Sequence, residues 1–260
     1  MKDSNTLILI NRNSKNNLEK LLRQLDKINS YDKKLKYILI VDNNSEDKSG
    51  KIIYENIVSN SYTKIILISN SANYGMGGSL KISFNYIFEN IDSDNIILMH
   101  TSGRTDIFVL YKKFITKNKY NYKYILMSRY NKNSTLTNYN LIRNLGNKFF
   151  NFLVFIFSGK FIEDHGSGIF LIKRELLKTI NFNKFTNDSF FNPQMNIVIS
   201  KKVNIEYVPV SWGESNVKSH LNIYLYSLKL IFFLIKYFFL RDRSFSNDID
   251  RFITNIEVKN

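Results

Sequence analysis

The sequence of 260 residues contains no cysteine, only two prolines and only three histidines. Without cysteine, the chain can form no disulfide, no thiolate zinc site and no thiol nucleophile. His100, His165 and His220 lack the spacing of zinc ligands. The two prolines, Pro193 and Pro209, do not make a proline-rich linker between domains. A Gly-x-Ser-x-Gly segment and a P-loop are also absent, which argues against an α/β-hydrolase with a serine nucleophile and against a P-loop NTPase.

The sequence also lacks the features of a secreted or nucleic-acid-binding protein. Residues 1–6 lead into an apolar run of only four residues, which is too short for a signal peptide. Lys and Arg number 37 against 22 Asp and Glu, giving a net charge of +15, but they are spread along the chain without a basic block. An AT-rich coding bias would produce the same excess. We expect a cytoplasmic protein that binds anionic lipid or phosphate-bearing ligands rather than nucleic acid.

Short apolar runs alternate with helical patterns over the first 100 residues. Between the runs, apolar residues recur at three- and four-residue spacing, as in Leu18, Leu21, Leu22 and Leu25. This alternation predicts an α/β fold with a doubly wound, mostly parallel sheet, whose ligands bind at the carboxyl ends of the strands. Strands are expected at 7–10, 37–41, 64–68, 95–99, 124–127, 169–172 and 204–209, and an apolar helix at 141–157.

The C-terminal segment has a different pattern. Residues 221–240 are mostly apolar, and Asn222, Lys229, Lys236 and Arg243 recur every seven residues, which places them on one stripe of a helix. Lysine is unfavourable near the centre of a transmembrane helix, whereas an interfacial helix combines an apolar face with a cationic stripe. We expect one α/β domain over 1–220 and an amphipathic, membrane-associating helical tail over 221–260. Docking of this helix on the protein's own core is the alternative.

Several segments resemble, in order, the motifs of glycosyltransferase family 2. Residues 41–47, Val-Asp-Asn-Asn-Ser-Glu-Asp, resemble the family's strand end Asp-Asp-Gly-Ser-x-Asp, and Asn13 matches the asparagine of its first-strand motif Pro-x-Tyr-Asn-Glu. Residues 70–80 are similar to its Asn-x-Gly-x-Gly-x-Ala segment. The later matches are Asp-x-x-Ser-Gly at 164–168 with Arg174, Phe-Asn-Pro-Gln at 191–194, and Val-Pro-Val at 208–210 with Ser219. The resemblance implies the GT-A fold.

The resemblance also implies that a nucleotide-sugar donor binds at these strand ends. Asp42 would accept hydrogen bonds from the base or ribose, unless it only caps the following helix. The glycine-rich turn would bring backbone N–H groups to a donor phosphate at a helix N-terminus, unless close packing explains the glycines. The expected donor-binding residues are Asn13, Asp42, Asn44, Ser45, Asp47, Gly75, Gly77, Gly78 and Ser102.

Residues 100–106, His-Thr-Ser-Gly-Arg-Thr-Asp, depart from the family pattern. In the family this loop carries Asp-x-Asp, or His-Gly-Asp-Gly-Gln in one branch, and its carboxylates hold Mg²⁺ or Mn²⁺ on the donor diphosphate. Ser102 stands at the position of the chief ligand, and a hydroxyl binds such cations poorly. Either Asp106 holds the metal ion, or Arg104 neutralises the diphosphate without one. Loss of catalysis is the third interpretation.

Two arginines resemble the dolichol- and polyprenyl-phosphate branch of the family. Ser-Arg-Tyr at 128–130 is similar to its Gly-Ser/Thr-Arg-Tyr, and Arg143, followed by Gly-Asn, is similar to its next basic element. The resemblance implies that Arg129 and Arg143 hold an acceptor phosphate. Surface ion pairs would be the simpler explanation for either side chain.

The implied reaction is an inverting displacement that moves a sugar from the nucleotide-sugar donor to a polyprenyl phosphate, or to a glycan or lipid-linked acceptor, at the inner face of the cell membrane. The expected catalytic residues are Arg104, for the charge of the leaving group, Arg129 and Arg143, for the acceptor, and Asp164, as the base for a hydroxyl acceptor. One alternative is a non-catalytic GT-A-like domain that binds nucleotide sugar or a partner transferase. Another is a nucleotidyltransferase, although residues 11–17 lack the glycine-rich loop that such an enzyme needs.

Overall fold

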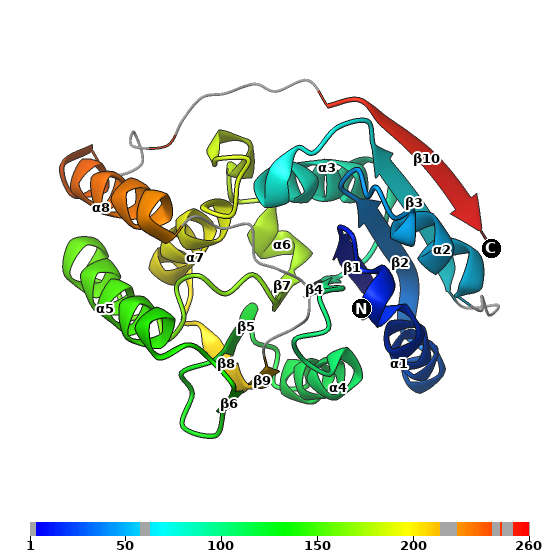
Figure 1. The fold of residues 1–260 in the computed structure, drawn as a ribbon, viewed down its shortest axis with the longest axis horizontal. Helices are drawn as coiled ribbons and strands as arrows, with labels where there is room; N and C mark the ends of the chain where they lie inside the picture. Colours follow the sequence, from blue (N-terminus) through cyan, green and yellow to red (C-terminus); the bar gives the residue numbers. More distant parts are fainter. Residues whose placement is uncertain (1–3, 58–62, 214–222, 241–244, 246–251, 260) are drawn as a thin grey trace.

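The computed structural model describes residues 4–57, 63–213, 223–240, 245 and 252–259. Eight strands form one sheet in the order β10-β3-β2-β1-β4-β7-β5-β8 (Figure 1). The strands are β1 (Asn5–Asn11), β2 (Leu35–Asp42), β3 (Lys64–Asn70), β4 (Asn95–His100), β5 (Tyr124–Ser128), β7 (Phe170–Lys173), β8 (Glu206–Pro209) and β10 (Thr254–Lys259). A separate two-stranded sheet pairs β6 (Thr135–Thr137) with β9 (Ser211–Gly213).

The sheet is mixed but mostly parallel, as predicted. β3, β2, β1 and β4 run parallel to one another, and β5 runs parallel to β8. β7 is antiparallel to both β4 and β5, and β10 is antiparallel to β3. The carboxyl ends of β1, β2 and β4 therefore meet at one edge of the sheet, where ligands bind in folds of this kind.

Helices cover both faces of the sheet. Successive side chains of β1 enter opposite cores: Leu7 and Leu9 pack with α1, α2 and α4, whereas Ile8 and Ile10 pack with α3, α7 and α8. Burial on both faces explains why the strands are continuous apolar runs. The helices are α1 (Leu18–Tyr31), α2 (Ser49–Asn56), α3 (Gly75–Asn90), α4 (Ile107–Asn118), α5 (Leu141–Ser158), α6 (Arg174–Leu177), α7 (Phe191–Lys202) and α8 (Ile223–Leu240), with 3₁₀ turns η1 (Lys15–Asn17) and η2 (Phe182–Lys184).

The C-terminal segment is only partly the expected helical tail. α8 is helical, as predicted, and lies beside α5 at the end of the molecule opposite β10 (Figure 1). Residues 254–259 are instead the edge strand β10, because their backbone groups pair with those of β3. The prediction of a helical tail over the whole of 221–260 is therefore wrong for this strand. Asn222 and Arg243 of the polar stripe lie outside the described residues, as does His220.

Candidate functional site

The carboxylate of Asp42, at the end of β2, is held by its neighbours. Oδ1 accepts hydrogen bonds from Asn11 Nδ2 at 2.7 Å and from Ser45 Oγ at 2.6 Å, and Oδ2 accepts one from Ser45 N at 3.1 Å. Asn11 Nδ2 also donates to Ser49 Oγ at 2.9 Å. A Cβ at Gly50 would come within 2.4 Å of the Asp42 carboxyl, so only glycine fits there. Asp42 thus ties the end of β1 to the loop after β2.

The other residues of this motif shape the loop between β2 and α2. Asn13 and Asn44 adopt left-handed backbone conformations, with φ of 49° and 57°. Asn13 Oδ1 accepts a hydrogen bond from Glu46 N at 3.0 Å. The Asp47 carboxylate accepts hydrogen bonds from the backbone N–H groups of Lys15 and Ser49, each at 2.9 Å. Asp47 rather than Asp42 therefore bonds the backbone at the first residue of α2. Burial raises the pKa of Asp47, but the hydrogen bond from the Ser49 hydroxyl and the two backbone N–H bonds outweigh burial, so the net pKa is lowered.

The glycine-rich turn does not present its N–H groups to a phosphate. Gly77 N donates to the Asp188 carbonyl at 3.2 Å, and Gly78 N donates to the Asn187 carbonyl at 3.0 Å. A Cβ at Gly77 would lie 2.1 Å from the Thr186 carbonyl oxygen. These glycines allow α3 to approach residues 186–188, so close packing explains Gly77 and Gly78, and the predicted phosphate contact through their N–H groups is wrong for this arrangement.

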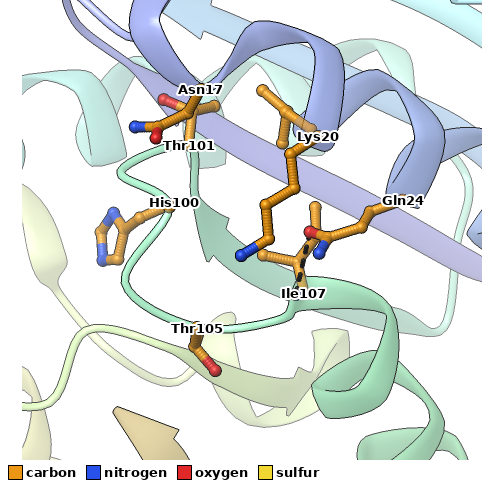
Figure 2. Close-up of a pocket in the computed structure, with 9 residues that line it drawn as sticks. Asn17, Lys20, Gln24, His100, Thr101, Thr105 and Ile107 are labelled. Carbon is orange, nitrogen blue, oxygen red and sulfur yellow. Dashed lines mark hydrogen bonds between the residues drawn. The ribbon is translucent and has the colours of Figure 1, made fainter. Parts of the chain in front are cut away.

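The loop after β4 packs against the start of α1. The Ser102 carbonyl accepts a hydrogen bond from Asn17 Nδ2 at 3.2 Å, and Gly103 has a φ of +72° with no room for a Cβ beside Asn17. Figure 2 shows the small pocket between the loop and α1, with the Lys20 side chain extending into it. The His100 ring points away from Lys20. The pocket is lined by Asn17, Lys20, Leu21, Gln24, His100, Thr101, Gly103, Thr105 and Ile107.

Burial and charge keep His100 neutral. Burial lowers the pKa of His100 to about 4, its bond with the backbone of Gly168 opposes this, and the nearby Arg104 charge lowers it further. The Arg104 carbonyl accepts a hydrogen bond from Gly213 N at 2.9 Å, which ties the loop to β9. The loop is therefore fixed at both ends, with the cationic Arg104 side chain close to the end of β4.

The described residues do not form a carboxylate site for a metal ion. Asp106 caps α4, because its Oδ1 accepts a hydrogen bond from Val109 N at 3.0 Å. Within the part of the chain that the structure describes, no group of three or more His, Cys, Asp or Glu side chains could hold a metal ion. The donor atoms at this loop thus do not fit Mg²⁺ or Mn²⁺ as the family's carboxylates do.

Arg129 and Asp164, both predicted as catalytic, form a buried ion pair. Arg129 Nε donates to Asp164 Oδ2 at 2.8 Å, Arg129 Nη2 donates to Oδ1 at 2.6 Å, and the backbone N–H of Arg129 donates to Oδ2 at 3.0 Å. The exposed fractions of the side chains are 14% and 1%. Burial lowers the pKa of Arg129, but the Asp164 carboxylate raises it more, so the net pKa lies above the usual arginine value. The pair joins the end of β5 to the turn before β7.

Aromatic side chains surround this ion pair. Arg129 Nη1 donates to the Tyr139 hydroxyl at 3.1 Å, and Asn147 of α5 donates to the same oxygen at 3.0 Å. The guanidinium also lies over the rings of Tyr130 and Trp212. A guanidinium has five N–H groups, and these bonds use three of them. The sequence pattern did not single out Tyr139, and it offered Asn147 only as part of the Gly-Asn pair after Arg143, because their contacts with Arg129 depend on the fold.

Arg143 lies on the first turn of α5 and is partly exposed. Its backbone N–H bonds the capping Asn140 side chain at 3.0 Å. The structure shows no hydrogen bond or ion pair between its guanidinium and another described residue. Arg143 thus stands on the helix that contacts Arg129 through Asn147 and Tyr139, but it is not part of the ion pair itself.

A family model and several solved structures match this chain. The model of glycosyl transferase family 2 matches residues 6–181. No curated protein sequence is significantly similar to the chain. Among solved structures, glucosyl-3-phosphoglycerate synthase from Mycobacterium tuberculosis superposes with a TM-score of 0.64 at 12% identity, covering 91% of this chain and 80% of that one.

A second structural neighbour is S. aureus TarS 1-349, with a TM-score of 0.58 at 14% identity. The match covers 92% of this chain but only 66% of TarS 1-349. At identities this low, the structural similarity establishes the fold alone, and it confirms the predicted GT-A architecture. The family match extends over most of the chain and confirms the predicted enzyme class. The chain therefore belongs to glycosyl transferase family 2, a family of nucleotide-sugar-dependent glycosyltransferases.

Proposed function

We propose that this enzyme transfers a sugar, with inversion, from a nucleotide-sugar donor to the phosphate of a lipid such as a polyprenyl phosphate, on the inner face of the cell membrane. The observation that carries the proposal is the Arg129–Asp164 pair, because it supplies a fixed cation while occupying the expected base. An acceptor phosphate is already anionic, so it needs a cation to position it and no base to activate it. A sugar hydroxyl would need a free carboxylate.

The donor side of the proposal is supported by the neighbours. TarS was solved with UDP and with UDP-GlcNAc, and the M. tuberculosis synthase with Mn²⁺, UDP-glucose and phosphoglyceric acid. The latter ligand carries a phosphate. In this chain the donor would lie at the ends of β1, β2 and β4, with Asp42 and Asn13 shaping the nucleotide side. Arg104 would face the charge that develops on the leaving diphosphate.

The roles of the two acceptor arginines follow from their surroundings. Arg129 would direct its two remaining N–H groups at the acceptor phosphate, while Asp164 keeps the guanidinium in place as a positioning residue. Arg143, on the same side through α5, would bind the phosphate from the helix start. Once the phosphate oxygen attacks the anomeric carbon, the bond to the nucleoside diphosphate breaks and no proton is transferred.

The proposal is tested by incubating purified full-length protein with a panel of nucleotide sugars and polyprenyl phosphate in detergent, and determining the anomeric configuration of the product by NMR. Arg129→Lys should raise the KM for the acceptor and leave donor affinity unchanged, because a planar two-donor contact is lost. A fall in donor affinity with an unmoved acceptor KM would remove this role for Arg129. Transfer only to glycan hydroxyls would replace the lipid-phosphate acceptor.

A non-catalytic role is the second candidate, and the loop after β4 favours it. Ser102 replaces the chief metal ligand, and Asp106 is occupied as a helix cap. Such a domain would bind nucleotide sugar, or a partner transferase, without turnover. Calorimetry showing tight nucleotide binding, combined with no product for any donor and acceptor, would support this candidate over the enzyme.

A further inference from the structure

One long side of α5 is apolar and open to solvent. Five large side chains on this side are more than half exposed, although a helix in a folded domain usually turns such residues inward. They recur with helical spacing, and the opposite side of the helix buries Phe150 and Val154 in the core. The exposed residues are Leu141 (75%), Ile142 (80%), Leu145 (67%), Phe149 (54%) and Phe152 (57%), followed by Ile156 (50%) and Phe155 (46%).

α8 has the same division into two faces. Leu230, Phe233, Leu234 and Tyr237 are buried in the core, so this face docks on the protein itself. The other face is also apolar and remains exposed. Its residues are Leu228 (66%), Ile231 (37%), Phe232 (72%), Ile235 (43%), Phe238 (45%) and Phe239 (75%). The two interpretations offered by the sequence, docking on the core and exposure of an apolar face, thus apply to opposite sides of one helix.

The two exposed faces belong to one surface. α5 and α8 lie side by side (Figure 1), and the rings of Phe157 and Phe238 meet edge to face with centroids 6.0 Å apart. Each helix has 18 residues and is therefore about 27 Å long. Exposed apolar patches of this extent mark interaction sites on soluble domains. Among the described residues, no helix is long and apolar enough to cross a membrane. The two helices would therefore contact a partner along their sides.

The charges around the surface are all of one sign on these two helices. Neither helix contains Asp or Glu, whereas Lys148 and Lys236 are exposed and Arg143 is partly exposed. Lys229 is also exposed, but it pairs with Asp188, which lies just before α7. Cations beside an apolar face match an anionic bilayer, in which aliphatic and aromatic groups enter the acyl boundary and lysines meet the lipid headgroups. In a two-fold dimer the same rim would meet itself, and the cations would repel.

We propose that α5 and α8 together form the docking surface for an anionic lipid bilayer. This assigns half of the surface to α5, a helix of the catalytic domain, rather than to the C-terminal segment alone. The surface also adjoins the Arg129–Asp164 pair. Asn147 of α5 bonds the Tyr139 hydroxyl, which in turn bonds Arg129. On α8, the Tyr226 hydroxyl lies near Gly166, because a Cβ built there would be 3.8 Å from that hydroxyl and 3.8 Å from Arg129 Nη2. If the proposed function holds, docking places that pair at the headgroup level.

The test is sedimentation of the full-length protein with vesicles of equal parts phosphatidylglycerol and phosphatidylcholine, at low salt. Phe152→Asp on α5 and Phe232→Asp on α8 should each weaken binding by roughly tenfold or more, because a charge enters the acyl boundary. Lys148→Glu should weaken it by roughly fivefold. Tyr120→Asp is the matched control, because Tyr120 is 73% exposed and follows α4, which lies apart from α5 and α8 (Figure 1), and this variant should bind like the wild type.

Three results would overturn the proposal. Phe152→Asp could bind vesicles as the wild type does, which leaves α8 alone as the contact. The protein could fail to bind anionic vesicles at all. It could also be a dimer in sedimentation equilibrium that Phe152→Asp dissociates, which would identify a second copy as the occupant. Circular dichroism of each variant verifies the fold. Vesicle binding without sugar transfer would contradict the proposed function and leave this surface in place.

Discussion

At the scale of single residues, the Arg129–Asp164 pair predicts a large effect on stability. Asp164→Asn removes the charge that compensates a guanidinium only 14% exposed, and breaking such a buried pair costs about 3–5 kcal/mol. Urea unfolding should show this loss. The matched control is Glu19→Gln, which breaks the exposed Arg23–Glu19 pair and should cost less than about 1 kcal/mol. Equal effects of the two substitutions would mean that the buried pair carries no special weight.

A second prediction at this scale concerns pH. Burial lowers the pKa of His165 to about 4, with Asp164 opposing and Arg129 adding to the effect. Between that value and 6.5 the unfolded chain binds a proton that the folded chain does not, so stability is present above pH 6.5 and falls as the pH drops towards 4. The loss between pH 7 and 5 should be about 2 kcal/mol. Unfolding of His165→Gln across this range should show a shallower slope, and an unchanged slope would assign the effect elsewhere.

The loop after β4 gives a third residue-scale prediction. Arg104 is the cation of this loop, and Asp106 already serves as a helix cap. We expect turnover to depend weakly on Mg²⁺ or Mn²⁺, and Arg104→Ala to be more damaging than a chelator, because a guanidinium binds a diphosphate with a permanent charge. Steady-state rates with and without chelator decide the matter. If the chelator abolishes turnover and Asp106→Ala does the same, the metal is held through Asp106.

At the scale of elements, two glycines should behave oppositely. Gly77→Ala places a Cβ 2.1 Å from the Thr186 carbonyl oxygen at the start of α3, so it should destabilise the fold by about 1–3 kcal/mol. Gly146 lies inside α5 with nothing within 4 Å of a new Cβ, and Gly146→Ala should stabilise by about 0.5–1 kcal/mol. Thermal unfolding measures both changes. A neutral Gly77→Ala would contradict close packing as the reason for this glycine.

The strand β10 changes how the C-terminal segment can be studied. Removing residues 221–260 to release the protein from membranes would also remove β10 and uncover the edge of β3, with its risk of aggregation. Phe252 also packs on Tyr74 at 5.0 Å between ring centroids. Single substitutions on α5 and α8 therefore separate membrane contact from folding, whereas the deletion confounds them.

The sequence predicts some elements well and others poorly, for physical reasons. β1 to β4 are buried on both faces, so each contains a continuous apolar run that can be recognised in the sequence. α7 is buried nearly all round, which removes the amphipathic period, and β10 is identified only by its pairing with β3 far away in the chain. In the site, the motifs supplied Arg129 and Asp164 separately. Their pairing across 35 residues needed the structure.

At the scale of the whole molecule, the net charge of +15 predicts how vesicle binding responds to salt. The Debye length falls from about 10 Å at 0.1 M to about 3 Å at 1 M salt, so attraction between the cationic rim and anionic lipid should weaken steeply over this range. The apolar faces of α5 and α8 do not depend on this attraction. Binding should therefore fall with salt to a residual level rather than to zero.

The variants separate these two contributions. Lys148→Glu should flatten the salt dependence and leave the residual binding in place, because it changes only the rim. Phe152→Asp should instead remove the residual binding at high salt, since it places a charge in the apolar face. Sedimentation with anionic vesicles at rising NaCl measures the salt-dependent binding and the residual binding of each variant. If wild-type binding disappears completely at high salt, the whole attraction comes from charge distributed over the molecule, and the apolar surface does not enter the bilayer.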